Sequence, residues 1–164
     1  MRPSAKHIGW KEACELSRCL AEKVRKDDYE PGVIIGIMDG GGFVAGLVAQ
    51  YLENKRVVCV PIGFYRPRTT ETVSPVPFSM IDVHPDIRDR RVLIVDDILD
   101  TGKTLQTAVD LFRKDADEVK TGVLHYRFSE TRFTPDYYVE NVDPHTSRVF
   151  YPWEVKSLAE APSL

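Results

Sequence analysis

Three aspartates, Asp96, Asp97 and Asp100, stand close together near the middle of the chain, and the segment Thr-Gly-Lys-Thr follows them directly. Neighbouring carboxylates can hold a divalent cation or the hydroxyl groups of a sugar. The unpaired N–H groups and the dipole at the start of a helix favour a bound anion. The spacing therefore predicts a phosphate site beside a group of acids.

The residues on either side indicate which elements position these groups. Branched aliphatic residues at 92–95 are typical of a strand that is buried on both faces of a parallel sheet. Beyond the acids, apolar residues recur at helical spacing as Leu105, Ala108, Val109 and Phe112. We therefore expect the first two acids at the carboxyl end of a strand, and the Thr-Gly-Lys-Thr segment at the start of a helix.

Parts of this pattern also occur in two different kinds of loop. A loop that binds nucleotide triphosphates needs a glycine five residues before Gly102, and Asp97 stands there instead. An ordinary strand-to-helix connection with acidic capping residues is the second kind. Three carboxylates, two threonines, a glycine and a lysine within nine positions favour a binding site over such a connection.

The segment 92–104, with the sequence VLIVDDILDTGKT, resembles the phosphoribosyl-pyrophosphate motif of the type I phosphoribosyltransferases. It is most similar to the form found in the hypoxanthine-guanine and xanthine-guanine enzymes. The resemblance implies that Asp96 and Asp97 contact the ribose hydroxyls, directly or through Mg²⁺, and that Asp100 lies beside N7 of the purine as the general base. It also implies that the 5′-phosphate is bound by Thr101, Gly102, Lys103 and Thr104.

Asp39, Gly40 and Gly41 follow another expected strand at 33–38 and resemble the pyrophosphate-binding loop of the same family. Glycine lets the backbone approach a ligand closely, and successive amides can bind an anion. Relatives usually have arginine or lysine where this chain has Asp39. An acid at this position repels pyrophosphate unless Mg²⁺ lies between them or the side chain turns away.

The C-terminal part of the chain resembles the purine-recognition segments of the 6-oxopurine enzymes. Arg127 stands where relatives have a lysine that contacts O6, and Arg148 stands where they have an aromatic residue that stacks on the purine. Glu154 stands where relatives have an acid near the metal and pyrophosphate. The residues expected at the base are Arg127, Arg148, Val149 and Phe150, with Tyr151 as an alternative stacking residue. Trp153 fits equally well as a residue that seals the edge of the core.

Residues 64–79 show no periodicity and include three prolines together with Arg66 and Arg68. A loop of this length in a compact domain is usually functional or disordered, and a surface excursion is the alternative. In the family, a mobile loop at this place closes over the reacting centre and excludes water. We interpret residues 64–79 as a flexible lid whose arginines reach toward the pyrophosphate.

Length and composition restrict the class of protein. The chain has 164 residues, 43% of them hydrophobic, which suits one domain with a sizeable core. A formal net charge of −3 argues against nucleic acid as a partner. Neither the three cysteines nor the four histidines show metal-ligand spacing. The sequence shows no signal-peptide pattern and no apolar run near the roughly 18 residues of a membrane span. We expect a cytoplasmic protein without a membrane partner.

The combined prediction is a single α/β domain over residues 1–164, with a mainly parallel sheet and helices on both faces. Its core is expected at about 33–126, and a small hood at about 127–164 with an N-terminal contribution. By the resemblance, the function is Mg²⁺-dependent transfer of a phosphoribosyl group from phosphoribosyl pyrophosphate to hypoxanthine, guanine or xanthine in a homodimer or higher homo-oligomer. The alternatives are a transferase for another base, such as adenine, and a non-catalytic regulator that senses a nucleotide.

Overall fold

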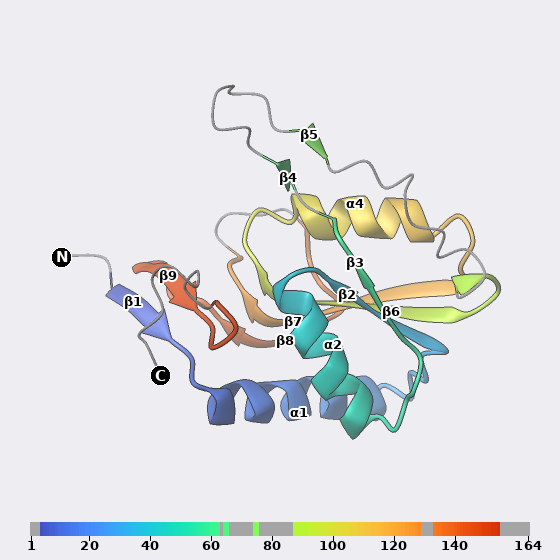
Figure 1. Ribbon diagram of the computed structural model, residues 1–164, viewed down its shortest axis with the longest axis horizontal. Coiled ribbons are helices and arrows are strands. Elements are labelled where there is room, and N and C mark those ends of the chain that lie inside the picture. The colour runs from blue at the N-terminus through green and yellow to red at the C-terminus, as the bar shows by residue number, and fades with distance from the viewer. Residues whose placement is uncertain (1–3, 63, 66–73, 76–86, 129–132, 155–164) are drawn as a thin grey trace, which may run out of the picture.

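Five parallel strands form the central sheet, in the spatial order β3-β2-β6-β7-β8 (Figure 1). The structure, a computed structural model, describes residues 4–62, 64–65, 74–75, 87–128 and 133–154. The strands of the sheet are β2 (Val33–Ile37), β3 (Val57–Val60), β6 (Arg91–Leu99), β7 (Glu118–Tyr126) and β8 (Tyr137–Asn141). Because β2 lies between two other strands and under helices, its aliphatic residues are buried along its whole length.

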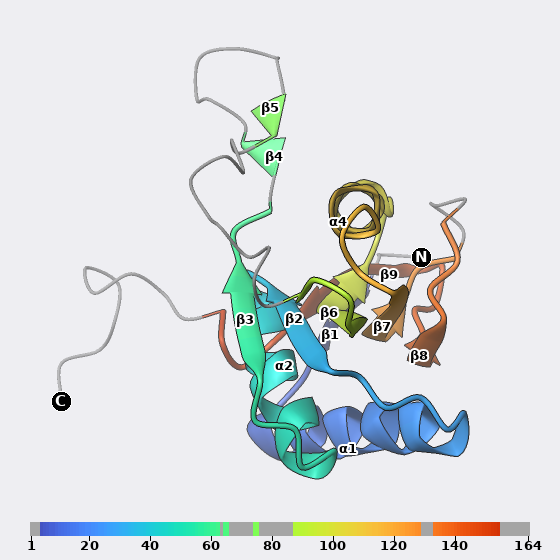
Figure 2. The ribbon, with the colours of Figure 1, turned by 90° about the vertical axis from the view of Figure 1, so that its right-hand side faces the viewer.

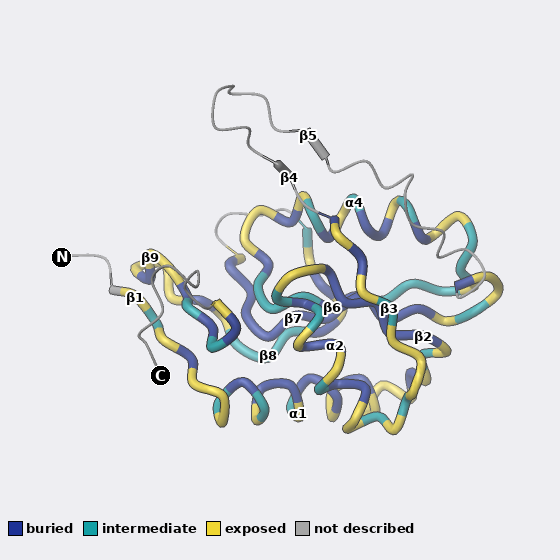
Figure 3. The backbone as a smooth tube through the Cα atoms, viewed as in Figure 1, coloured by how far each residue is buried: buried dark blue, intermediate teal, exposed yellow. Residues whose placement is uncertain are grey.

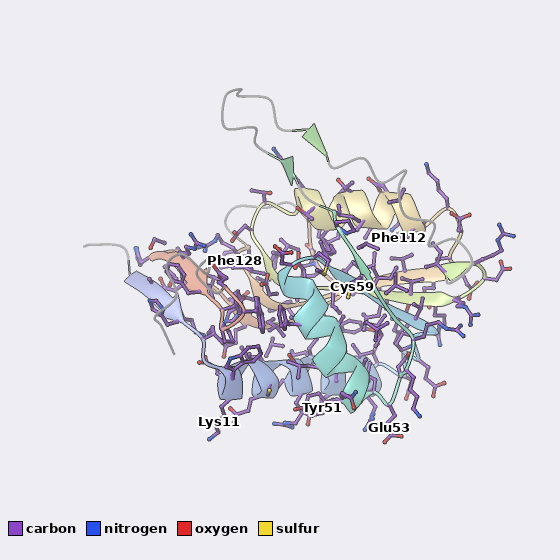
Figure 4. All side chains as sticks on the ribbon, in the orientation of Figure 1. Lys11, Tyr51, Glu53, Cys59, Phe112 and Phe128 are labelled. Carbon is purple, nitrogen blue, oxygen red and sulfur yellow. The ribbon has the colours of Figure 1, made fainter. Side chains whose placement is uncertain are left out.

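Helices cover both faces of this sheet (Figures 1 and 2). The helices α1 (Trp10–Lys26) and α2 (Gly40–Tyr51) lie on one face, and α4 (Lys103–Phe112) lies on the other. Each face has its own apolar core, and Phe112, labelled in Figure 4, is among the largest fully buried side chains in the core under α4. The predicted α/β class with helices on both faces is confirmed.

The two ends of the described chain meet in a second, two-stranded sheet. In this hood sheet, β1 (Ser4–His7) pairs in parallel with β9 (Thr146–Phe150). Arg127, directly after β7, donates from Nη1 to the main-chain oxygen of Thr146 at 2.8 Å, so β9 is tied to the carboxyl end of β7. A small hood with an N-terminal contribution is therefore present, but residues 137–141 of the predicted range 127–164 form β8 of the central sheet, and the hood's bounds stay a prediction.

The strand β6 runs further than its aliphatic residues predict. The aliphatic run ends at residue 95, but β6 continues to Leu99 and therefore contains Asp96 and Asp97. The neighbouring strand β7 extends alongside, with Asp96 paired to Val123 and Leu99 to Tyr126. Both acids therefore lie in the carboxyl-terminal part of β6, as expected, although the strand runs two residues beyond them. Backbone pairing with β7 satisfies the hydrogen-bonding groups of β6 whatever its side chains are.

The predicted lid at 64–79 is described only in two short pieces. The strands β4 (Phe64–Tyr65) and β5 (Ser74–Pro75) form an antiparallel pair. The rest of the segment, including Arg66 and Arg68, lies outside the described residues, so the lid stays a prediction.

Burial follows the layers of the fold. Figure 3 shows the buried residues along the central strands and on the inner sides of the helices. In the part of the chain that the structure describes, no helix combines the length and apolar character needed to cross a membrane.

Candidate active site

A cleft of about 680 Å³ opens at the carboxyl ends of β2, β6 and β7, next to β9. Ligands of open parallel sheets bind at this edge of the sheet. The loop after β2, the end of β6, the residue after β7 and the C-terminal segment 147–154 all contribute to its lining. Eight of the predicted site residues line it, namely Asp39, Gly40, Asp97, Asp100, Arg127, Arg148, Val149 and Glu154.

The remaining predicted site residues lie outside this lining. Asp96 and Gly41 are neighbours behind it, because a Cβ on Gly41 would lie 3.1 Å from Asp96 Oδ1. The residues 101–104 form the start of α4 and the turn before it. Phe150 stacks on His7 of β1, with ring centroids 4.8 Å apart. In this conformation Phe150 is therefore part of the hood sheet, and Val149 and Tyr151 are the neighbours that reach the cleft.

The start of α4 has the geometry of an anion site. Gly102 is the N-cap, with φ of 78°, a left-handed conformation that glycine adopts without a steric penalty. The helix begins at Lys103, so its first N–H groups lack partners within the helix. The predicted sequence of strand, turn and helix is present, and the 5′-phosphate assignment of residues 101–104 stays a prediction.

Asp96 and Asp97 are adjacent acids whose charged forms are disfavoured by burial. The main-chain N–H of Asp97 donates to Asp96 Oδ1 at 2.9 Å. Burial raises the pKa of Asp96 well above its usual range, and the charge of Asp97 raises it further. Burial also raises the pKa of Asp97, although the hydrogen bond from Trp153 opposes that increase. A bound cation, or a hydroxyl group that donates a hydrogen bond, would lower the free-energy cost of ionising both acids.

Asp97 is held from two sides by the C-terminal segment. Trp153 Nε1 donates to Asp97 Oδ2 at 2.9 Å, and the hydroxyl of Tyr151 donates to the main-chain oxygen of Asp97 at 3.0 Å. The Trp153 ring stacks between Phe43 of α2 and Tyr151, with centroid distances of 5.3 and 5.0 Å. Trp153 therefore seals the edge of the core and also contacts a predicted ligand-binding acid.

The glycines after β2 fit tightly against β6. A Cβ on Gly40 would overlap Asp97 Oδ2, and a Cβ on Gly41 would lie only 2.6 Å from the main-chain oxygen of Val95. Packing against the strand thus requires glycine here, in addition to any approach of the backbone to a ligand. Asp39, at the N-terminal end of α2, is exposed and lines the cleft.

Arg127 forms an ion pair with the predicted general base. Its Nε lies 2.8 Å from Asp100 Oδ1, and its Nη1 donates to the main-chain oxygen of Thr146. The side chain of Arg127 is 6% exposed and that of Asp100 is 50% exposed. The guanidinium therefore lies buried behind Asp100, which faces the cleft. The resemblance implies a contact with purine O6 at this position, and sequence reasoning missed the ion pair.

Glu154 and Arg148 also interact with each other. Arg148 Nη2 lies 2.7 Å from Glu154 Oε2, and Glu154 Oε1 accepts a hydrogen bond from the main-chain N–H of Tyr151. The Arg148 guanidinium lies 4.6 Å from the centroid of the Phe150 ring. Glu154 thus fixes the turn after β9, whereas its role toward a metal stays a prediction.

The acids of the cleft suit magnesium in one respect. In the described ranges, no three His, Cys, Asp or Glu side chains converge in a way that could hold a metal by themselves. Mg²⁺ is commonly bound by one or two carboxylates together with substrate oxygens and water. Asp96 and Asp97 are hard oxygen donors whose charges repel each other, so they fit a cation that a substrate helps to hold.

Comparison with known proteins identifies the family. The family model described as "Phosphoribosyl transferase domain" matches residues 10–158. The chain therefore belongs to the phosphoribosyltransferase domain family. A solved structure of a purine phosphoribosyltransferase from Pyrococcus horikoshii Ot3 has a TM-score of 0.78 and 31% sequence identity, over 97% of this chain and 99% of that chain.

Two curated relatives cover different amounts of the chain. A xanthine-guanine phosphoribosyltransferase from Cereibacter sphaeroides is 25% identical over 152 residues, which are 91% of this chain and 86% of the relative. The bifunctional protein PyrR from Clostridium beijerinckii is 30% identical over 83 residues, which are 48% of this chain and 47% of the relative. The matched part of this chain thus spans about half the length of that relative.

Proposed function

We propose that the protein transfers a phosphoribosyl group from phosphoribosyl pyrophosphate to a 6-oxopurine base and releases pyrophosphate. The observation that supports this most strongly is the convergence of Asp97, Asp100 and the Asp39–Gly40 loop on one cleft at the carboxyl edge of the sheet. The resemblance to a purine phosphoribosyltransferase over nearly the whole chain supports the purine as the acceptor. The xanthine-guanine relative favours a 6-oxopurine over adenine.

In this proposal, each acid has a separate task. Asp100 accepts the proton from N7 of the purine, while the Arg127 guanidinium holds the carboxylate in place by the 2.8 Å contact to Oδ1. Asp97, which lines the cleft, and Asp96 directly behind it would bind the ribose hydroxyls and, together with substrate oxygens, would hold Mg²⁺. When bound, the ion supplies positive charge that stabilises the departing pyrophosphate. The 5′-phosphate binds to the first N–H groups of α4.

The purine lies, in this proposal, between Asp100 and the segment 147–151 that closes the cleft. Val149 and Tyr151 supply apolar surface there, and Arg148 can stack on a base. Arg127, which also lines the cleft, is bound to Asp100 and to Thr146 and so holds Asp100 in place beside the purine.

The test is to incubate the purified protein with phosphoribosyl pyrophosphate, Mg²⁺ and one base at a time, and to measure nucleotide formation. We expect product with hypoxanthine, guanine or xanthine, and much less with adenine.

A second candidate function, a non-catalytic nucleotide sensor, is favoured by the exposed acid Asp39 in the pyrophosphate loop. The sensor would bind phosphoribosyl pyrophosphate or a nucleotide in a calorimetric titration and form no product with any base.

A further inference from the structure

A chain of hydrogen bonds runs from the N-terminal strand to Asp97 through the interior. Lys6 Nζ of β1 lies 3.4 Å from His125 Nε2, near the end of β7. His125 Nδ1 lies 2.6 Å from the hydroxyl oxygen of Tyr151. The Tyr151 hydroxyl in turn lies 3.0 Å from the main-chain oxygen of Asp97. Three segments that are far apart in the sequence are thus connected to one residue of the cleft.

The main-chain oxygen of Asp97, at the end of this chain of contacts, determines the direction of each hydrogen bond. A main-chain oxygen can only accept, so the single hydroxyl proton of Tyr151 is donated to Asp97. The Tyr151 oxygen must then accept from His125, which therefore carries its proton on Nδ1. The unprotonated Nε2 is left to accept from the Lys6 ammonium group, which also donates to Glu140 at 2.6 Å. This neutral tautomer of His125 satisfies the contacts with Tyr151 and Lys6, and Glu140 Oε2, which also lies 3.4 Å from Nε2, is bound by the same Lys6 ammonium group.

The imidazole of His125 and the hydroxyl of Tyr151 have no role in the steps proposed above, in which only the apolar surface of Tyr151 faces the purine. His125 is 1% exposed and Tyr151 is 4% exposed, so water cannot easily replace the hydrogen bond between them. The acceptor that they fix is the carbonyl of Asp97, whose side chain faces the cleft and whose N–H holds Asp96. A rotation of the peptide group after Asp97 would change the direction of the backbone that carries both acids.

We propose that His125 and Tyr151 are positioning residues that fix the orientation of Asp97 for phosphoribosyl pyrophosphate, and that Lys6 links the N-terminal strand to this site. The inference rests on the proposed function, because it assumes that Asp97 binds the ribose. It predicts that the hydroxyl of Tyr151 affects the affinity for this substrate although it does not touch it.

The test compares two tyrosines that both donate to the backbone of β6. The hydroxyl of Tyr29 donates to the main-chain oxygen of Val92 at 2.9 Å, at the opposite end of the strand from the cleft, and Tyr29 is 2% exposed. Tyr29→Phe is therefore a matched control for Tyr151→Phe. We expect Tyr151→Phe to weaken the binding of phosphoribosyl pyrophosphate with Mg²⁺ by about three- to tenfold, as for a lost hydrogen bond, and Tyr29→Phe to leave it unchanged.

A second pair of variants tests the donor. Asparagine can place an N–H near the position of His125 Nδ1, whereas leucine cannot. His125→Asn should therefore retain most of the affinity, and His125→Leu should lose as much as Tyr151→Phe. In each weakened variant, the KM for phosphoribosyl pyrophosphate should change more than the KM for the purine, because Asp97 is proposed to bind the ribose. General damage to the fold would instead change both KM values.

The outcomes distinguish the positioning role from the proposed function. If the unmodified protein does not bind phosphoribosyl pyrophosphate, the proposed function fails and the positioning role fails with it. If the unmodified protein binds but Tyr151→Phe binds as tightly as Tyr29→Phe, only the positioning role is overturned. A ¹⁵N spectrum of the ligand-free protein that shows His125 protonated on Nε2 alone would overturn the positioning role as well.

Discussion

The variant His125→Asn should lose less unfolding free energy on acidification than the unmodified protein does. In the folded protein, burial and then the charge of Lys6 lower the pKa of His125 from 6.5 to about 4, although Glu140 opposes the shift. The unfolded chain takes up a proton on this ring near pH 6.5 and the folded chain does not. The contribution of neutral His125 is therefore fully present above pH 6.5 and is lost as the pH falls toward 4.

The size of the effect follows from the two pKa values. One pH unit corresponds to about 1.4 kcal/mol for one proton, so the interval from 6.5 to about 4 gives an upper value of about 3 kcal/mol. Local opening of the hood in acid would reduce it, and we expect about 2 kcal/mol. The hydrogen bonds that lower the pKa of Asp27 and Glu140 are also lost in acid, so only a difference between variants separates the effect of His125, including its effect on Glu140, from that of Asp27.

The assay is urea denaturation of the unmodified protein and His125→Asn at several pH values between 7 and 4. The unmodified protein should be more stable at pH 7, and the gap in unfolding free energy should shrink by about 2 kcal/mol toward pH 4. Tyr29→Phe is the control, because it removes a buried group that does not titrate in this range, and its gap should stay constant. If the difference in unfolding free energy between the unmodified protein and His125→Asn also stayed constant with pH, the inference that buried His125 is neutral would be refuted.

Three further variants test the acids. Asp100→Asn should bind phosphoribosyl pyrophosphate nearly normally in calorimetry, while nucleotide formation slows by about 100- to 10,000-fold; unchanged turnover would assign the base elsewhere. Asp96→Asn with Asp97→Asn should abolish that binding yet raise the melting temperature at pH 7, a gain that disappears below about pH 4 because both native pKa values are raised. Arg127→Met should cost about 1 to 2 kcal/mol in urea denaturation, because Asp100 is half exposed and regains water; a loss above about 4 kcal/mol would contradict this.

The layered fold could be predicted because its signals are local. The aliphatic runs of β2 and β6 and the helical spacing before and after them are visible in short windows of sequence. The end of β6 could not be predicted in the same way. Asp96 and Asp97 break the aliphatic pattern, and only the backbone of β7, which pairs alongside, extends the strand to Leu99.

The contacts of the cleft depend on distant parts of the chain. Lys6 and His125 are 119 residues apart, and Trp153 and Asp97 are 56 residues apart. No pattern of spacing relates such residues before the sheet order is known. The resemblance to a family indicated which acids gather at the cleft, because that depends on strand ends, but it could not indicate the partners that hold them.

The same contacts explain how the ligand-free cleft can keep its shape around four acids. A carboxylate offers about four acceptor positions, so one donor orients it and leaves capacity for a ligand. Trp153 orients Asp97 in this way, and Arg127 orients Asp100. Since both donors are buried, the acids do not need to be ordered again when a substrate arrives, and less conformational entropy is lost on binding. Under the proposed function, the C-terminal segment therefore contributes to substrate binding even where it does not touch the substrate.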